Sequence, residues 1–196
     1  MSIGISFKRG FLAAACLLAL SGAAQAVEVA GVQVDDSAKV ANTDLKLNGA
    51  GLRTKAFFKI YVAGLYLTDK KTTPADALAA PGPKRVSLTM VREVTSDQLS
   101  QALLDGLNHN CSDEEKSRFF NQMLAIGQIF GAYRSIKPKD MINVDWVPNT
   151  GTVVYLNGKK LGEPLPDQAF YNAILKIWLG DRPAENSLKR QLLGAP

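Results

Sequence analysis

Apolar and polar residues alternate with a period of two over much of the first half of the chain, which is typical of β-strands. Residues 27–34 alternate around a glycine turn, and residues 45–47 form a short strand signal. The glycines of Asn48-Gly49-Ala50-Gly51 permit positive φ and predict a turn there. Longer strands are predicted at 57–67 and 84–92, the first so apolar that both its faces should be covered.

The middle of the chain changes to helical spacing. Thr95 and Gln98 form a capping-box pattern, which predicts a helix that runs past Gly106. Ser112 and Glu115 form a second box and predict another helix. Its apolar stripe, with steps of four and three residues, indicates core packing. The stripe consists of Phe119, Met123, Ile126, Phe130 and Tyr133.

Strand signals return after these helices. Strands are predicted at 141–147 and 151–156, and Asn157-Gly158 is a strong hairpin turn into a further strand. Helices follow from about Asp167 to Gly180 and over about 184–193. Strands and helices are thus segregated along the chain, which favours an α+β fold with an antiparallel sheet.

The N-terminal segment has the pattern of a secretory signal peptide. Lys8 and Arg9 precede a short apolar run, and Ala24-Gln25-Ala26 supplies the small-x-small cleavage pattern. The run is too short to span a membrane stably, and a buried N-terminal helix is the alternative. Lipidation at Cys16 is disfavoured, since no leucine stands three positions before it. We therefore expect a signal peptide at 1–26, a single domain at 27–196 and a periplasmic or secreted protein.

Cleavage there changes the charge and the cysteine content. The formal net charge of the 196-residue chain falls from +5 to +3, and its basic residues are scattered rather than clustered, which argues against nucleic-acid binding. Cys111 becomes the only cysteine, so no intrachain disulfide can form. With His109 as the single imidazole, the composition offers no zinc ligand set. A nucleophile–histidine triad is disfavoured, since there is no Gly-x-Ser-x-Gly motif and Cys111, two residues from His109, should point away from it. We expect no metal and no cofactor.

One arginine stands out among the remaining residues. Arg53 follows the glycine-rich segment and leads into the apolar strand that contains Tyr61 and Tyr66. An arginine beside an apolar sheet face can anchor a carboxylate while the ligand's tail lies on apolar side chains. The alternative is that Arg53 extends to solvent and Tyr61 is an amphipathic core residue.

Several segments in this order resemble the chalcone isomerase superfamily, specifically its bacterial chalcone isomerase-like proteins. The resemblance implies an open-faced β-sandwich, in which helices pack on one side of a large antiparallel sheet. The superfamily contains plant enzymes that cyclise chalcones and non-catalytic relatives that bind fatty acids. The segments are 47–53, 58–67, 91–94, 147–152, 157–162 and 173–181.

The resemblance also implies a set of ligand-binding residues. Arg53 matches the arginine that steadies the phenolate or enolate in the plant enzymes, and Tyr61 takes the place of a strand threonine. Leu99 and Gly106 replace a tyrosine and an asparagine of a helix, and Ile177 replaces a second threonine. Three of these replacements remove a side-chain hydrogen bond that the cyclisation would need.

An arginine and a tyrosine at these two positions instead resemble the fatty-acid-binding relatives, where that pair holds the carboxylate. The sequence therefore predicts a periplasmic, non-catalytic binder of a fatty acid or similar amphipathic acid. Phe57 and Phe58, with Leu99 and Ile177, are candidates for the apolar wall. Two alternatives are an isomerase that acts on an unsaturated ketone, with Arg53 as electrophile, and a module that binds another envelope protein.

Overall fold

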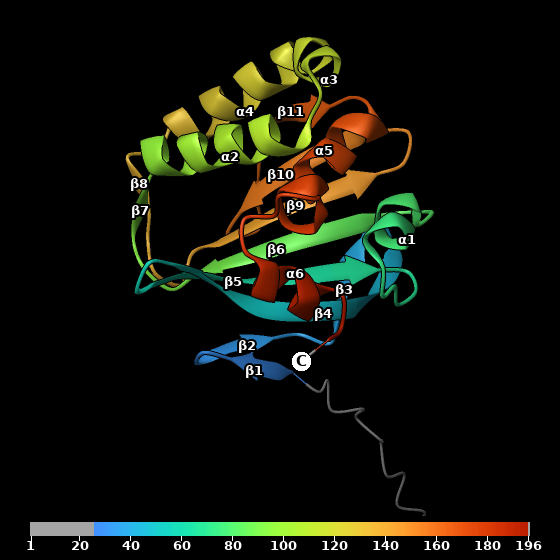
Figure 1. Ribbon diagram of the computed structural model, residues 1–196, viewed down its shortest axis with the longest axis vertical. Coiled ribbons are helices and arrows are strands. Elements are labelled where there is room, and N and C mark those ends of the chain that lie inside the picture. The colour runs from blue at the N-terminus through green and yellow to red at the C-terminus, as the bar shows by residue number, and fades with distance from the viewer. Residues whose placement is uncertain (1–25, 196) are drawn as a thin grey trace, which may run out of the picture.

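The computed structural model describes residues 26–195 and is built around one antiparallel sheet of seven strands (Figure 1). The strand order is β11-β10-β9-β6-β5-β4-β3, and every neighbouring pair is antiparallel. Its strands are β3 (Ser37–Val40), β4 (Thr43–Lys55), β5 (Phe58–Leu67), β6 (Lys84–Met90), β9 (Met141–Val147), β10 (Gly151–Leu156) and β11 (Lys159–Leu165).

The helices gather on one side of this sheet (Figure 1), which confirms the predicted α+β architecture. They are α1 (Pro74–Ala79), α2 (Ser96–Asn110), α3 (Asp113–Arg118), α4 (Phe120–Gly131), α5 (Gln168–Leu179) and α6 (Asn186–Leu192). Two small ribbons complete the described chain. They pair β1 (Val27–Val29) with β2 (Val32–Val34) and β7 (Val94–Thr95) with β8 (Ser135–Ile136).

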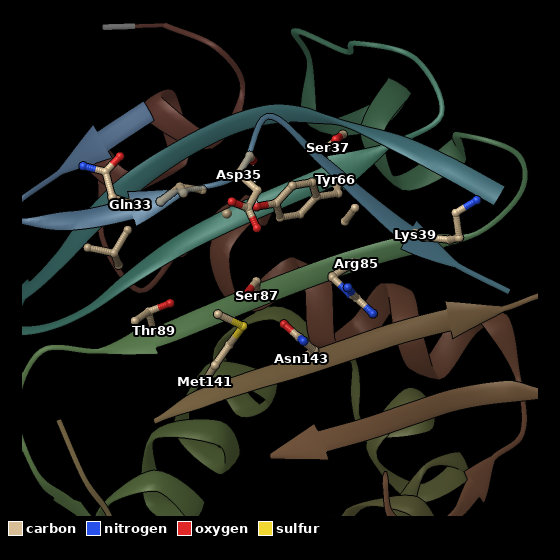
Figure 2. A pocket seen from close by; sticks show the side chains of 14 residues that line it. Gln33, Asp35, Ser37, Lys39, Tyr66, Arg85, Ser87, Thr89, Met141 and Asn143 are labelled. Carbon is tan, nitrogen blue, oxygen red and sulfur yellow. Dashed lines mark hydrogen bonds between the residues drawn. The ribbon is translucent and has the colours of Figure 1, made fainter. Parts of the chain in front are cut away.

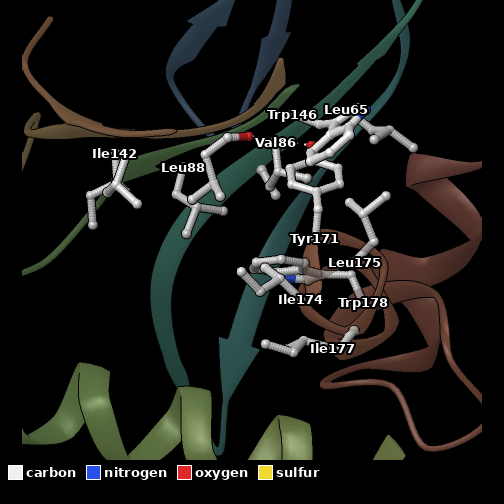
Figure 3. Packing of buried hydrophobic residues seen from close by; sticks show 14 of the residues in the cluster. Leu65, Val86, Leu88, Ile142, Trp146, Tyr171, Ile174, Leu175, Ile177 and Trp178 are labelled. Carbon is white, nitrogen blue, oxygen red and sulfur yellow. Dashed lines mark hydrogen bonds between the residues drawn. The ribbon is translucent and has the colours of Figure 1, made fainter. Parts of the chain in front are cut away.

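Helix α5 forms the centre of the main core. Figure 3 shows its Tyr171, Ile174 and Trp178 packed against side chains of the central strands. Eight of the twelve residues of α5 are buried, so the helix is covered on more than its sheet side. Helix α2 supplies that outer cover, and it approaches α5 closely where Gly106 meets Ile177.

The two capping boxes form as the sequence predicts. Thr95 accepts a hydrogen bond from the backbone of Gln98, and the Gln98 side chain accepts one from the backbone of Thr95. Ser112 and Glu115 make the same reciprocal pair. The single helix expected after Ser112 is wrong in one respect. The chain leaves helical geometry at Phe119, which is buried and separates α3 from α4.

The turn predicted at Asn48-Gly49-Ala50-Gly51 is also wrong, because these residues lie inside the 13-residue strand β4. The buried Asn48 side chain bonds to the backbone of Lys71 and to the carbonyl of Leu192. A Cβ at Gly49 would lie 2.1 Å from the carbonyl oxygen of Gln191 in α6. Glycine is needed here for the close approach of a helix and not for a turn.

A lysine is buried on the helix side of β6. Lys84 has no exposed surface, and its Nζ donates a hydrogen bond of 2.5 Å to the carbonyl of Leu78 in α1. Burial lowers its pKa from the usual 10.5 to about 8. Burial therefore makes the ammonium ion less favourable than it is in water, although Lys84 is still mostly protonated at pH 7.

The Lys84→Met substitution should remove a pH dependence of stability. Between pH 8 and pH 10.5 the unfolded chain keeps the Lys84 proton and the folded chain releases it, so the wild-type free energy of unfolding rises with pH. The variant should lack this rise and be about 1–3 kcal/mol more stable at pH 7. Urea unfolding between pH 7 and pH 10 measures both effects. The exposed Lys70→Met variant is the control, and parallel profiles for wild type and Lys84→Met would contradict the prediction.

Candidate functional site

The candidate arginine and tyrosine lie directly opposite each other on neighbouring strands. Arg53 near the end of β4 pairs in register with Tyr61 near the start of β5. Cross-strand partners have Cβ atoms about 5 Å apart on the same face of a sheet. That face is the helix side, because Ala63 and Leu65, which alternate with Tyr61 along β5, belong to the main core. The structure therefore brings Arg53 and Tyr61 together between the sheet and the helices.

The hydroxyl of Tyr61 is fixed by a tryptophan. Trp178 of α5 donates a hydrogen bond of 2.9 Å from its Nε1 to this hydroxyl oxygen. Burial raises the pKa of Tyr61 above its usual value, although the Trp178 hydrogen bond and the charge of Arg53 act in the opposite direction. The phenol thus stays protonated at neutral pH. None of the hydrogen bonds among residues 26–195 uses its proton, so it remains available as a donor.

Arg53 already holds a carboxylate, that of Glu185. Its Nη1 lies 3.1 Å from Oε2 of Glu185, the residue that precedes α6. The backbone N–H of Thr54 donates to the same oxygen at 2.7 Å, and the Thr54 hydroxyl donates to Oε1 at 3.0 Å. Nη1 also donates to the carbonyl of Thr54. This end of β4 is therefore built to bind a carboxylate with charge-assisted hydrogen bonds.

Glu185 is ionised in this arrangement. Its partial burial acts to raise its pKa, but hydrogen bonds from Ser187, Thr54 and Arg53 outweigh burial and lower the pKa below the usual value. Both members of the Arg53–Glu185 pair keep about a fifth of their side-chain surface exposed. The pair is therefore accessible to a competing anion.

The three apolar candidates lie on the helices that cover this region. Leu99, in the first half of α2, is partly buried against the main core. Gly106 and Ile177 touch each other, since a Cβ at Gly106 would lie 2.8 Å from Cγ2 of Ile177. These two residues bring α2 close to α5 and leave no space between them. Gly106, which the resemblance aligns with an asparagine of the plant enzymes, therefore lies at the contact between α2 and α5.

Phe57 and Phe58 do not form an apolar wall, so that prediction is wrong. They lie at the turn between β4 and β5, where Phe57 is 99% exposed and Phe58 is 57% exposed. The predicted burial of both strand faces holds further along β5, where residues 62–67 are all buried. Phe57 is left almost fully in solvent, and Phe58 is covered in part by the guanidinium of Arg92.

The opposite face of the sheet carries a separate, more polar groove. A cavity of about 300 Å³ lies between the β2–β3 segment and strands β5, β6 and β9. Figure 2 shows Ser87, Arg85 and Asn143 on its floor. Arg85 binds Asp145 through two hydrogen bonds of 2.6 and 2.7 Å, and these bonds raise the pKa of Arg85. This groove does not contain any of the five predicted binding residues.

Comparison with protein families identifies the fold. A family model described as chalcone isomerase-like matches residues 26–194. The chain belongs to the chalcone isomerase-like family. This assignment confirms the predicted resemblance to chalcone isomerase-like proteins, and the five candidate residues stay a prediction.

A solved chalcone isomerase-like structure has the same fold. It is the crystal structure of a fatty-acid binding protein from Arabidopsis thaliana, with a TM-score of 0.68 and 16% sequence identity. The match covers 83% of this chain and 92% of that chain. A comparison with curated protein sequences gave no match.

Two further findings describe this chalcone isomerase-like chain. The described residues contain no group of three or more His, Cys, Asp or Glu side chains that could hold a metal ion. None of the helices from α1 to α6 is long and apolar enough to cross a membrane.

Sequence reasoning missed Glu185, Thr54 and Trp178. Glu185 is separated from Arg53 by 132 residues, and Trp178 from Tyr61 by 117. No local spacing links such positions. The contact of Trp178 could have been predicted in part from the sequence. A buried indole usually needs an acceptor for its N–H, and Tyr61 is one of the few residues in the apolar strand whose side chain can accept it.

Proposed function

We propose that this protein binds a fatty acid or a similar amphipathic carboxylate in the periplasm without converting it chemically. The observation that carries the proposal is the direct pairing of Arg53 with Tyr61 at a point where Arg53 already binds a carboxylate. A ligand carboxylate would replace that of Glu185 or bind beside it on the guanidinium of Arg53.

The donors for a ligand carboxylate are present. Glu185 and the carbonyl of Thr54 both bond to Nη1 of Arg53, and a hydrogen bond from Arg53 also acts on the Tyr61 hydroxyl. Tyr61 contributes its unused phenolic proton, and Trp178 holds the phenol oxygen in place. A guanidinium edge and a phenol together suit the two oxygens of one carboxylate.

The tail of the ligand would lie between α2 and the start of β5. Leu99 and Leu103 of α2 are apolar and only partly buried against the main core. An acyl chain that covers their remaining exposed surface would gain about 25 cal/mol for each Å² of apolar surface removed from water. Ile177 and Gly106 would limit the depth of entry, because α2 and α5 are in contact at that point.

One comparison and two features of the chain support a binder. The structure with a TM-score of 0.68 is named a fatty-acid binding protein. The polar groups that a chalcone cyclisation needs are absent at Leu99, Gly106 and Ile177. The protonated Tyr61 suits a hydrogen-bond donor rather than a general base.

The proposed periplasmic location depends on export by the predicted signal peptide. The first 25 residues and the expected cleavage at Ala26 lie at or outside the edge of the described structure. Mass spectrometry of the protein recovered from cells that express the whole chain would test cleavage. A mature N-terminus at Val27 supports a periplasmic or secreted protein, and an intact Met1 contradicts it.

The function is tested by titration with two ligands that differ only in the headgroup. A long-chain fatty acid should bind to the purified protein with micromolar or tighter affinity, and its methyl ester should bind at least tenfold more weakly because it carries no charge for Arg53. Isothermal titration calorimetry measures both affinities, and native mass spectrometry gives the stoichiometry. Equal affinity for acid and ester would overturn the carboxylate site, and turnover of a chalcone would replace it with the isomerase function.

A further inference from the structure

The turn between β4 and β5 exposes two aromatic residues, Phe57 and Phe58. Residues Ala56 and Phe57 form a tight connection between Lys55 and Phe58, which are paired across the strands. Phe57 is 99% exposed, the largest value among the large apolar side chains of the described chain. We refer to Phe57 and Phe58 as the aromatic tip. Exposure of this extent contributes nothing to the stability of the fold.

Cations surround the aromatic tip. Lys55 and Lys59 flank it in the sequence and are both exposed. The guanidinium of Arg92 lies 4.3 Å from the centre of the Phe58 ring, a cation–π contact that holds this charge at the tip. None of these three cations forms an ion pair with a carboxylate of residues 26–195.

The same end of the sheet carries further positive charge. The backbone N–H of Arg92 bonds to the carbonyl of Ile60, and that of Lys139 bonds to the carbonyl of Met90, the last residue of β6. Lys137 lies two residues before Lys139, and both lysines are exposed. Figure 1 shows the β4–β5 turn, the end of β6 and the β7–β8 ribbon at this one end.

Two carboxylates at this end of the sheet, those of Glu93 and Asp140, accept hydrogen bonds from neighbouring residues. Glu93 accepts a hydrogen bond from the hydroxyl of Ser135. Asp140 accepts bonds from the backbone of Lys137 and from the side chain of Asn157. Asp97 and Arg134, which border the β7–β8 ribbon, are also exposed. Six cations therefore lie at this end of the sheet with three acidic groups, and Lys55, Lys59 and Arg92 are those next to the aromatic tip.

We propose that the aromatic tip docks this protein on the surface of an anionic lipid bilayer. Phe57 enters the boundary between headgroups and acyl chains, while Lys55, Lys59 and Arg92 contact the phosphate layer. Aromatic side chains favour this boundary, and basic residues next to it gain from the negative surface potential. The charge around the tip selects an anionic bilayer over a neutral one. Docking of this kind inserts a turn and does not span the membrane.

The test uses vesicles and a chain that begins at Ala26. This chain retains every core residue, from Val34 to Leu193, and lacks the apolar run that would bind vesicles by itself. Flotation with vesicles of phosphatidylcholine and phosphatidylglycerol at 1:1 should recover the protein, and vesicles of phosphatidylcholine alone should not. Binding should fall steeply as the salt concentration increases.

Two substitutions and two matched controls identify the surface that binds. Phe57→Ser should weaken binding by about tenfold, and Lys59→Glu by about fivefold or more. The controls are Phe120→Ser on α4, where Phe120 is as exposed as Phe58, and Lys70→Glu just beyond the far end of β5. Both controls should stay within twofold of wild type, and thermal unfolding confirms that all four variants fold.

A Phe57→Trp variant reports insertion directly. The two native tryptophans, Trp146 and Trp178, are at least 90% buried and give a constant background. On anionic vesicles the emission of the new indole should shift to the blue and be quenched by brominated acyl chains. Equal binding of wild type and Phe57→Ser would overturn the proposal. So would concentration-dependent dimerisation that Phe57→Ser abolishes, because the tip would then bind a second copy. No free fatty acid is present, so the result is independent of the proposed ligand site.

Discussion

Replacement of Arg53 by glutamine should weaken fatty-acid binding by roughly 30-fold, the cost of losing charge-assisted hydrogen bonds to a carboxylate. Two effects add in this variant. The ligand loses the guanidinium, and the ionised Glu185 remains at the site without the cation that balances its charge. Glutamine keeps much of the side-chain volume, so the packing of β4 against α6 should change little. Isothermal titration calorimetry with the same fatty acid measures the loss.

The matched control for this prediction is Arg190→Gln. Arg190 belongs to α6, the helix that Glu185 precedes, and it is exposed. Its replacement changes the net charge by the same amount and should leave the affinity within twofold of wild type. An equal loss in both variants would mean that general electrostatic attraction, and not the paired Arg53 and Tyr61, binds the ligand.

Glu185→Gln should shift the affinity in the other direction. Glutamine can still accept the hydrogen bonds from Thr54, but it removes the negative charge that occupies Arg53. The fatty acid should then bind several-fold more tightly, since it no longer competes with an internal carboxylate. Weaker binding by Glu185→Gln would show that Glu185 orients Arg53 for the ligand instead of competing with it.

The sequence predicted the sheet and most helices because their signals are local. Strands β9 and β10 have the predicted bounds, and the capping boxes of Thr95 and Ser112 start helices where expected. Asn157-Gly158 forms the predicted hairpin turn with positive φ at both residues. Each of these features depends on residues that are neighbours in the chain. Local chemistry is therefore sufficient to find them.

The failures concern features that depend on distant parts of the chain. The glycines of β4 suggested a turn, because a sequence alone cannot show that α6, more than 130 residues later, will pack on them. Phe57 and Phe58 suggested a buried strand, because aromatic residues are typical of strands. The sequence does not show that the strand begins at Phe58 and that its first residues are exposed. The candidate site was predicted only in part, and its role in ligand binding stays a prediction. The resemblance paired Arg53 with Tyr61, but the carboxylate of Glu185 reaches Arg53 only through the tertiary fold.

The close packing of α6 on β4 leads to the largest expected effect on stability. A Cβ at Gly49 would lie 2.1 Å from the carbonyl oxygen of Gln191 and 2.8 Å from the carbonyl carbon of Leu192. Both are backbone atoms, which cannot rotate away as a side chain can. Gly49→Ala should therefore force α6 off the strand and lower the free energy of unfolding by about 3 kcal/mol.

Urea unfolding at pH 7 measures this loss, and Gly127→Ala is the matched control. Gly127 lies within α4, and a Cβ there would meet nothing within 4 Å. The same substitution at Gly127 should raise the free energy of unfolding by up to about 1 kcal/mol, because alanine favours the helix. Displacement of α6 would also move Glu185 away from Arg53. An unchanged unfolding midpoint in Gly49→Ala would show that α6 does not need the close approach that these glycines allow.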